Sequence, residues 1–262
     1  MLTPVINYLI KLRLPSRCPM LDYLNDLIQA HLHQIPYESY SKILDTERHI
    51  EFGCYLPPVE LSNDRITSQG LGGTCWVLAR SFAWLLSNLG FDAALVYMDP
   101  GHLCVRVDIG GIPYYVDVGY GAPLFKAFPM SQSFMIEAPS ERFAFSVTGN
   151  GAMVVRTPGP SKFLAFEKRQ IGEITEMIAF ANRWETSRHL KIPTVSKFVD
   201  GRFVRLIWNT LKDWRCGELQ ETLLTDNQVS QLLPEVFGVD PRHFFLTREL
   251  LARRGINEET RV

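Results

Sequence analysis

The sequence predicts an α+β fold, and three observations along its 262 residues support that class. Apolar patterns with helical period dominate the first ninety residues, short strand-like runs fill the middle third, and the tail mixes both patterns. Hydrophobic residues make up 46% of the chain and charged residues 21%. This length and composition suffice for a large buried core in one domain or in two to three subdomains.

Two N-terminal segments carry the helical pattern. The stretch "MLDYLNDLIQAHL" (20–32) places one apolar stripe at three- and four-residue intervals, formed by Leu21, Leu24, Leu27, Ile28 and His31. A pattern break follows at Pro36, inside 35–44. A second helix is predicted to begin at Cys75 and to end near Gly90, which occupies the position of a C-terminal cap.

Strand-like runs follow Gly90 and are separated by turn residues. They cover 91–98, 103–109, 112–120, 142–147 and 152–157. The glycine pair at 110–111, between the second and third runs, predicts a tight hairpin. The middle third is therefore expected to form an antiparallel sheet or a small barrel.

The last third begins with a predicted linker helix over 173–187. A strand-like run covers 202–211, and a helix is expected over 225–238 with Thr225 or Asp226 as its N-cap. From these patterns we divide the chain into a helical domain (1–90), a β domain (91–172), a linker region (173–194) and an α/β domain (195–262).

The charge balance argues against binding to nucleic acid or to a membrane surface. Lys and Arg number 27 and Asp and Glu 28, so the net charge is −1, and there is no basic footprint or polybasic segment. The first 19 residues lack the order of a signal peptide, and no apolar stretch is long enough to span a bilayer. We expect a soluble, cytoplasmic protein whose oligomeric state the sequence leaves open.

The cysteines favour neither a disulfide framework nor a metal site. Five are scattered along the chain without a Cys-x-x-Cys pair, namely Cys18, Cys54, Cys75, Cys104 and Cys216. No structural zinc spacing is present, and no metal is expected. The cysteines are therefore free thiols, and most free thiols are inert core residues.

Cys75 is the exception, because it stands in "GLGGTCWVLARSF" (70–82). Gly72 and Gly73 permit backbone conformations and close approaches that other residues cannot make. The first turn of a helix favours a thiolate over a thiol, and its N–H groups can stabilise an oxyanion. A small buried residue after a glycine-containing loop is the alternative interpretation.

A thiolate nucleophile needs a base, and the base needs an orienting group. His102 opens a strand directly after the turn "DPG", where a side chain can reach a cleft. Strand alternation places His102, Cys104 and Arg106 on one face and apolar residues on the other. A histidine at this position can also be merely solvated or structural.

Asp117 strengthens the base interpretation of His102. It stands in "YYVDVGYG", flanked by valines in a predicted buried strand, where a carboxylate is costly unless it is paired. Pairing across the hairpin would bring Asp117 near the His102 end. The alternative is an Asp that bonds to turn backbone before Gly119. The order Cys, His, Asp matches a catalytic triad on a papain-like core without a metal.

Several blocks then resemble the arylamine N-acetyltransferase family, a distant relative of the papain and transglutaminase folds. "GGTC" is similar to the family's nucleophile loop, "GHLCVRVDI" to its histidine strand, and "YVDVGYG" to its most specific signature. "IPYESY", "IPTVSKF" and "LLPEVFGVD" resemble further blocks in family order, over roughly residues 35–240.

The resemblance implies an N-terminal helical bundle, a central antiparallel β-barrel and a C-terminal α/β lid. It makes Cys75 the acyl-accepting nucleophile, His102 its base and Asp117 the orienting acid. It implies ping-pong transfer from acetyl-coenzyme A, or another acyl-coenzyme A, to an aryl amine, hydrazine or related small-molecule amine. A biosynthetic and a detoxifying role would use the same triad.

The resemblance also suggests binding residues and shows departures from the family pattern. Tyr37, Gly101, Tyr120, Ser196 and Phe198 are candidate residues for binding the substrate or coenzyme A. The family has Arg, an aromatic residue and Glu where this chain has Leu71, Thr74 and Val77. The interval from Cys75 to His102, 27 residues, is shorter than usual, and "CWVLA" is more similar to transglutaminases.

Two other functions remain open at this stage. The same triad could serve a transglutaminase-like amidase, peptidase or amide synthase that does not use coenzyme A. The departures at Leu71, Thr74 and Val77 also leave open a member of the fold that has lost turnover.

Overall fold

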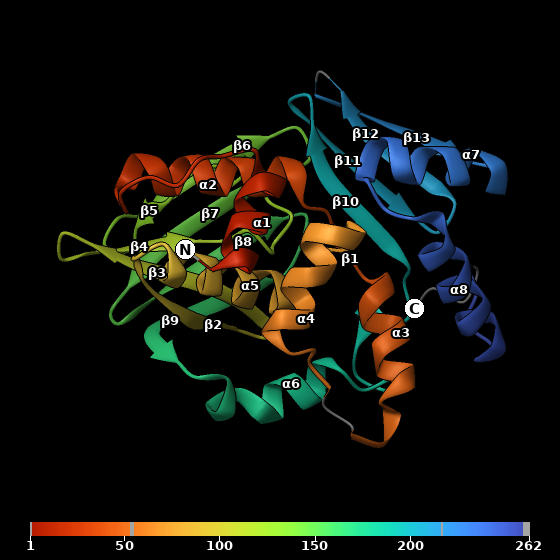
Figure 1. The fold of residues 1–262 in the computed structure, drawn as a ribbon, viewed down its shortest axis with the longest axis horizontal. Helices are drawn as coiled ribbons and strands as arrows, with labels where there is room; N and C mark the ends of the chain where they lie inside the picture. Colours follow the sequence, from red (N-terminus) through yellow and green to blue (C-terminus); the bar gives the residue numbers. More distant parts are fainter. Residues whose placement is uncertain (1, 53–54, 216, 259–262) are drawn as a thin grey trace.

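The computed structural model describes residues 2–52, 55–215 and 217–258 and confirms the α+β class (Figure 1). Its helices are α1 (Thr3–Leu12), α2 (Leu21–Gln34), α3 (Tyr40–Arg48), α4 (Val59–Asp64), α5 (Cys75–Asn88), α6 (Thr175–Ala181), α7 (Asp226–Leu232) and α8 (Pro241–Arg253). Short 3₁₀ or π turns cover Ile50–Phe52, Arg65–Gln69, Ile171–Ile174, Arg188–Leu190 and Leu233–Phe237. Among the described residues, no helix has the length and apolar character that a membrane crossing requires.

Thirteen strands in the described part of the chain form two antiparallel sheets. The strands are β1 (Tyr37–Glu38), β2 (Asp92–Asp99), β3 (His102–Ile109), β4 (Ile112–Val116), β5 (Phe128–Pro129), β6 (Phe134–Ala138), β7 (Glu141–Thr148), β8 (Gly151–Thr157), β9 (Ser161–Arg169), β10 (Thr194–Val199), β11 (Arg202–Ile207), β12 (Thr210–Arg215) and β13 (Glu218–Leu223). The larger sheet has the order β5-β4-β3-β2-β9-β8-β7-β6, and the smaller has β1-β10-β11-β12-β13.

The larger sheet is a curled half-barrel with α5 on one face. Its edge strands β5 and β6 approach each other, because the rings of Phe128 and Phe134 stack with centroids 3.9 Å apart. The predicted hairpin joins β3 to β4, where Ile109 pairs with Ile112 across a two-residue turn. Gly110 and Gly111 have φ of 59° and 79°, which a type I′ turn requires.

The predicted alternation along β3 is confirmed. Leu103, Val105 and Val107 lie in the core cluster that also contains the apolar face of α5. Cys104 lies in a second cluster inside the half-barrel, together with Phe143. Both faces of β3 are therefore covered, and a side chain at its end can be buried without being apolar.

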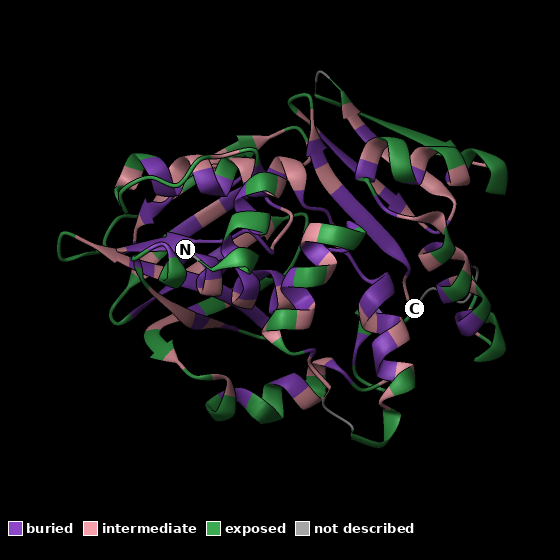
Figure 2. Ribbon diagram, in the orientation of Figure 1, coloured by how far each residue is buried: buried purple, intermediate pink, exposed green. Residues whose placement is uncertain are grey.

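The smaller sheet has a packed outer face and an inner face that points toward the rest of the molecule. Val195, Val204 and Leu206 pack on one side against the segment 229–244, which includes α7, the turn after it and the start of α8. Figure 2 shows that β10 is largely buried along its length. Strand β1 comes from the N-terminal segment and pairs with β10. The division of the chain at residues 90, 172 and 194 stays a prediction.

Several predicted elements differ from the observed ones in length. The run over 202–211 is divided into β11 and β12 by a tight turn, in which Trp208 has φ of 50°. The linker helix covers Thr175–Ala181 alone, and the side chain of Asn182 beyond it donates to the Tyr55 carbonyl oxygen at 2.9 Å. Thr225 is the N-cap of α7, as predicted, and forms a capping box with Gln228.

Candidate active site

Cys75 is the first residue of α5. Thr74, before it, has extended backbone (φ −89°, ψ 179°), so the chain enters the helix abruptly. The first N–H groups of a helix lack intrahelical acceptors, and the helix dipole places partial positive charge there. The Cys75 side chain is buried, with 8% of the residue exposed. Its sulfur therefore lies where a negative charge is stabilised.

His102 connects Cys75 to Asp117. Its ring Nε2 lies 2.7 Å from Oδ2 of Asp117, and both side chains are buried. The His102 ring also forms a hydrogen bond with the Cys75 side chain. Because Asp117 occupies Nε2, Nδ1 is the nitrogen left to exchange a proton with the thiol. The structure thus brings together the three residues that the sequence singled out.

Asp117 lies just after β4. The prediction that it stands inside a strand is wrong, because the ladder between β3 and β4 ends at the pair Val105–Val116. Both carboxylate oxygens are used by donors outside the ladder. Oδ2 accepts from the Tyr115 hydroxyl at 2.7 Å as well as from His102, and Oδ1 accepts from the Gly119 N–H at 3.0 Å. Asp117 therefore binds both the His102 ring and the turn backbone at Gly119, and its role as the orienting acid of a triad stays a prediction.

The two groups that would exchange the proton have shifted pKa values. Burial acts to raise the pKa of Cys75, but the charge of His102, its hydrogen bond and the charge of Lys42 outweigh burial and lower it. Burial acts to lower the pKa of His102, but the charges of Asp117 and Cys75 raise it to about 9. Both shifts act in the direction that favours a thiolate–imidazolium pair.

Gly119 allows this geometry because it lies directly against the nucleophile. A Cβ added at Gly119 would lie 2.7 Å from Cα of Cys75 and 3.1 Å from its Cβ. The backbone after β4 and the first turn of α5 are thus in contact. This explains why a glycine follows the acid by two residues in "VDVGYG".

Glu38 holds the nucleophile loop, and the sequence did not single it out as a site residue. It is fully buried, and its Oε1 accepts from the Gly73 N–H at 2.7 Å and from the Ser41 hydroxyl at 2.6 Å. Its own N–H donates to the Gly73 carbonyl oxygen at 3.0 Å. Burial raises the pKa of Glu38. The signal for this role was the block "IPYESY", which brings a carboxylate into an otherwise apolar stretch.

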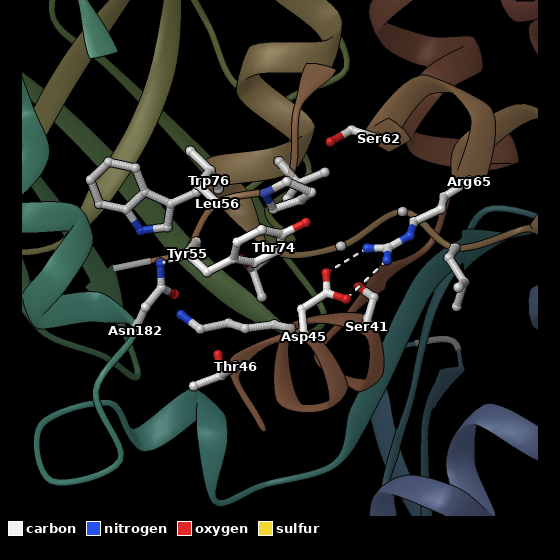
Figure 3. A pocket seen from close by; sticks show the side chains of 16 residues that line it. Ser41, Asp45, Thr46, Tyr55, Leu56, Ser62, Arg65, Thr74, Trp76 and Asn182 are labelled. Atoms are coloured by element: carbon white, nitrogen blue, oxygen red, sulfur yellow. Dashed lines mark hydrogen bonds and ion pairs between the residues drawn. The ribbon is translucent and has the colours of Figure 1, made fainter. Parts of the chain in front are cut away.

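A pocket lies beside the nucleophile loop and is separate from the Cys75 sulfur. Figure 3 shows Arg65 bound to Asp45 at this pocket, with Thr74 and Trp76 of the loop and helix nearby. The guanidinium of Arg65 binds both carboxylate oxygens of Asp45, at 2.5 and 2.9 Å. The backbone of Arg65 accepts a hydrogen bond from the Leu71 N–H. This ion pair therefore supports the loop from its helical side.

Tyr120 covers the other side of His102. The two rings stack with centroids 4.1 Å apart and planes 25° from parallel. The guanidinium of Arg156 lies over the same tyrosine ring at 4.3 Å and is held by the buried Glu141. The His102 ring is thus fixed by stacking as well as by Asp117.

Three of the predicted binding residues lie on the inner face of the smaller sheet. Tyr37 pairs with Ser196 across β1 and β10, and Phe198 is two residues further along β10, so all three side chains share this face. The charge of Cys75 acts on Tyr37. Phe198 lines an aromatic pocket together with Phe125, Phe203 and Trp214.

Gly101 lies in the turn between β2 and β3, with φ of 68°. Its N–H donates to the Tyr97 hydroxyl at 2.8 Å, and nothing lies within 4 Å of the position that a Cβ would occupy. The structure therefore explains Gly101 by its backbone conformation. Its role in binding stays a prediction.

The remaining cysteines contribute no second nucleophile in the described residues. Cys104 is buried and its thiol donates to the Val96 carbonyl oxygen, and burial raises its pKa well above the ordinary value. Its sulfur lies within 4.8 Å of ligand atoms of His102 and Asp117, but the Asp117 oxygens already accept three hydrogen bonds. These residues fit a metal ion poorly. Cys18 is a free, exposed thiol, and Cys54 and Cys216 lie outside the described residues.

Comparisons with known proteins place the chain in a family. A family model described as N-acetyltransferase matches residues 20–243. The chain belongs to the arylamine N-acetyltransferase family. This N-acetyltransferase resembles the Salmonella typhimurium arylamine N-acetyltransferase with a TM-score of 0.79, at 16% identity over 94% of this chain and 98% of that one. The Mycobacterium marinum enzyme in complex with CoA matches with a TM-score of 0.76, at 19% identity over 93% and 94% of the two chains.

A curated relative with a different name also matches. Proansamycin X synthase of Amycolatopsis mediterranei is 29% identical over 120 residues. The match spans 40% of this N-acetyltransferase and 43% of that relative, less than half the length of either.

Proposed function

We propose that this N-acetyltransferase transfers an acetyl or short acyl group from acyl-coenzyme A to an aryl amine, a hydrazine or a related amine through a thioester on Cys75. The observation that supports this most is the buried chain of hydrogen bonds from Cys75 through His102 to Asp117 at the start of α5. A co-substrate of this kind agrees with the CoA bound to the M. marinum relative.

In the first half-reaction the Cys75 thiolate attacks the thioester carbonyl carbon. The carbonyl oxygen gains negative charge, which N–H groups at the start of α5 are placed to stabilise. The carbon–sulfur bond to coenzyme A then breaks, and the leaving thiolate takes the proton from the His102 imidazolium. The products are an acyl-Cys75 thioester, free coenzyme A and neutral His102.

In the second half-reaction the amine attacks the acyl-Cys75 carbonyl carbon. His102 takes one proton from the amine nitrogen, and the bond from carbon to Cys75 sulfur breaks. The products are the amide and the thiolate–imidazolium pair with which the cycle began. Asp117 keeps the imidazole in orientation and stabilises its charge through both half-reactions.

We assign the predicted binding residues to the walls of the cleft in this scheme. Tyr37, Ser196 and Phe198 form one wall on the inner face of the smaller sheet, and Tyr120 forms part of the opposite one. Gly101 is assigned to the approach of the thioester beside His102. Alanine at Phe198 should raise the KM for an aromatic acceptor more than it lowers kcat.

Intact-mass measurement with acetyl-coenzyme A tests the mechanism directly. The protein should gain the mass of one acetyl group, Cys75→Ser should gain none, and an added aromatic amine should remove the group. Cys18→Ser is the matched control and should acetylate as the unaltered protein does. Steady turnover by a Cys75→Ser protein would overturn the mechanism.

An amide synthase is the second candidate, and the match to proansamycin X synthase favours it. In that case a carrier-bound or other activated acyl chain, and not coenzyme A, would supply the acyl group to Cys75. The same measurement separates the two functions: a simple N-acetylcysteamine thioester of a longer acyl chain would acylate Cys75, whereas acetyl-coenzyme A would not.

A further inference from the structure

The side chain of Arg205 lies on the inner face of the smaller sheet, and no ion pair joins it to an anion among the described residues. It belongs to β11 and pairs with Ser196 of β10, which in turn pairs with Tyr37 of β1. Residues directly opposite each other in antiparallel strands share a face, so the three side chains form one row on the inner face. The row ends next to the nucleophile loop, because Glu38, the neighbour of Tyr37 on β1, forms hydrogen bonds with Gly73.

Two members of this row have polar atoms without partners within the described residues, whereas the Tyr37 hydroxyl lies 3.3 Å from Nδ1 of His189. The Nε of Arg205 and the Oγ of Ser196 are both buried without a hydrogen-bond partner. No carboxylate of the described chain forms an ion pair with Arg205, although the neighbouring Arg156 is paired with Glu141. A buried guanidinium nitrogen and a buried hydroxyl without partners are costly, so this arrangement indicates a ligand.

The side chains of Arg205 and Ser196 lie beside the same glycine, Gly121. The position of a Cβ on Gly121 lies 3.9 Å from a terminal nitrogen of Arg205 and 4.0 Å from the Ser196 hydroxyl. Gly121 is two residues from Gly119, which touches Cys75. The guanidinium also lies over the Phe203 ring at 5.4 Å, so it is bounded by an apolar wall.

We propose that Arg205 and Ser196 form a subsite for a carboxylate carried by the acyl group or by the acceptor amine. A guanidinium fork matches a carboxylate with two parallel hydrogen bonds, and the hydroxyl adds a third donor. The phosphates of coenzyme A fit less well, since they lie at the far end of the pantetheine arm from the thioester. This inference rests on the proposed function for its choice of substrates, but the subsite can be tested without turnover.

Alkylation of Cys75 by a matched pair of reagents tests the subsite itself. The pair is para-(bromomethyl)benzoate and the neutral para-(bromomethyl)benzamide, with Cys75 followed by peptide mass spectrometry. The ratio of the two rates should fall about tenfold in Arg205→Met, the size expected for loss of a charge-assisted hydrogen bond, and less in Arg205→Lys. Lys212→Met is the control, because Lys212 follows Arg205 in the same row but is paired with Glu221 at 2.7 Å.

Steady-state kinetics then identify which substrate carries the carboxylate. A rise in KM for malonyl-coenzyme A but not acetyl-coenzyme A in Arg205→Met places it on the acyl group. A rise for para-aminobenzoate but not para-aminobenzamide places it on the acceptor. An unchanged alkylation ratio in Arg205→Met, with an unchanged melting temperature, would overturn the subsite. A changed ratio in a protein that acetyl-coenzyme A does not acylate would instead leave the subsite standing and overturn the acetyl donor.

Discussion

Asp117→Asn removes the charge that keeps His102 protonated, while preserving the size of the side chain. The pKa of His102 rises from 6.5 to about 9 even though burial opposes the rise. That difference corresponds to about 3 kcal/mol of stabilisation of the imidazolium. The charge of Asp117 raises this pKa more than the charge of Cys75 does, and the hydrogen bond from Asp117 raises it more than the one from Cys75. We therefore assign at least half of this stabilisation to Asp117.

Losing half of it weakens the thiolate–imidazolium pair by about 1 to 2 kcal/mol, which is about tenfold in its population. The rate at which iodoacetamide alkylates Cys75 at pH 7 should therefore fall by at least about tenfold in Asp117→Asn. Peptide mass spectrometry resolves Cys75 from the other thiols. Asp108→Asn is the control, because it removes the same charge from the same hairpin, where Asp108 binds Arg106 and Lys168.

The outcome that would refute this reasoning is equal alkylation of Cys75 in Asp117→Asn and in the unaltered protein, with similar melting temperatures. Such a result would mean that the charge of Asp117 does not reach the sulfur through His102. A general loss of folding is recognised separately, since the buried Cys104 would then react as well.

Three further predictions concern the supports of the site. Gly119→Ala should lower the free energy of unfolding, measured by urea unfolding, by about 2 kcal/mol, because the added methyl group clashes with Cys75. Gly172→Ala is the control and should change this free energy little, because its Cβ would lie in open space. Glu38→Ala should lower the free energy of unfolding by about 3 kcal/mol, because it leaves three donors of Ser41 and Gly73 without an acceptor. Glu47→Ala, at the surface, is the comparison. An equally small effect in both variants would contradict this role of Glu38. The folded-state pKa of His102 is raised, so its protonation contributes up to about 3 kcal/mol to the free energy of unfolding. This contribution is fully present below pH 6.5 and is lost as the pH rises through about 9. His102→Gln should flatten that part of the pH–stability curve, and an unchanged curve would count against the raised pKa.

The sequence predicts the Cys75, His102 and Asp117 cluster because each residue stands beside a strong local signal. The glycine pair at 110–111 fixes the hairpin and so the pairing of β3 with β4, which carries His102 to Asp117. These features depend on neighbours in sequence or on one hairpin.

The sequence does not predict what depends on distant chain segments. Tyr115 was part of an apolar run, and its hydroxyl acquires a role once Asp117 turns back toward it. Arg205 was one charged residue in the strand-like run over 202–211, which contains a turn that the sequence analysis did not predict. That Arg205 forms no ion pair with a carboxylate among the described residues follows only from the assembled structure. The helix α8 was not predicted, although Asp240 and Pro241 give it a recognisable start.

The departures at Leu71 and Val77 are explained by the way in which the nucleophile loop is held. Leu71 is buried in the core of the smaller sheet, in one cluster with Val195 and Phe237. Val77 fills the space over Gly73, since a Cβ there would lie 2.8 Å from that of Val77. The loop is thus fixed by apolar contacts at two points and by Glu38 at a third.

Glu38 also couples this loop to the cleft wall. It is adjacent to Tyr37 on β1, so the two side chains point to opposite faces: Glu38 binds Gly73 of the loop, and Tyr37 joins the row of Ser196 and Arg205. A shift of β1 would therefore move the nucleophile loop and the proposed carboxylate subsite together. The two-residue strand β1 accordingly links the position of the Cys75 sulfur to that of the proposed carboxylate subsite at Arg205 and Ser196.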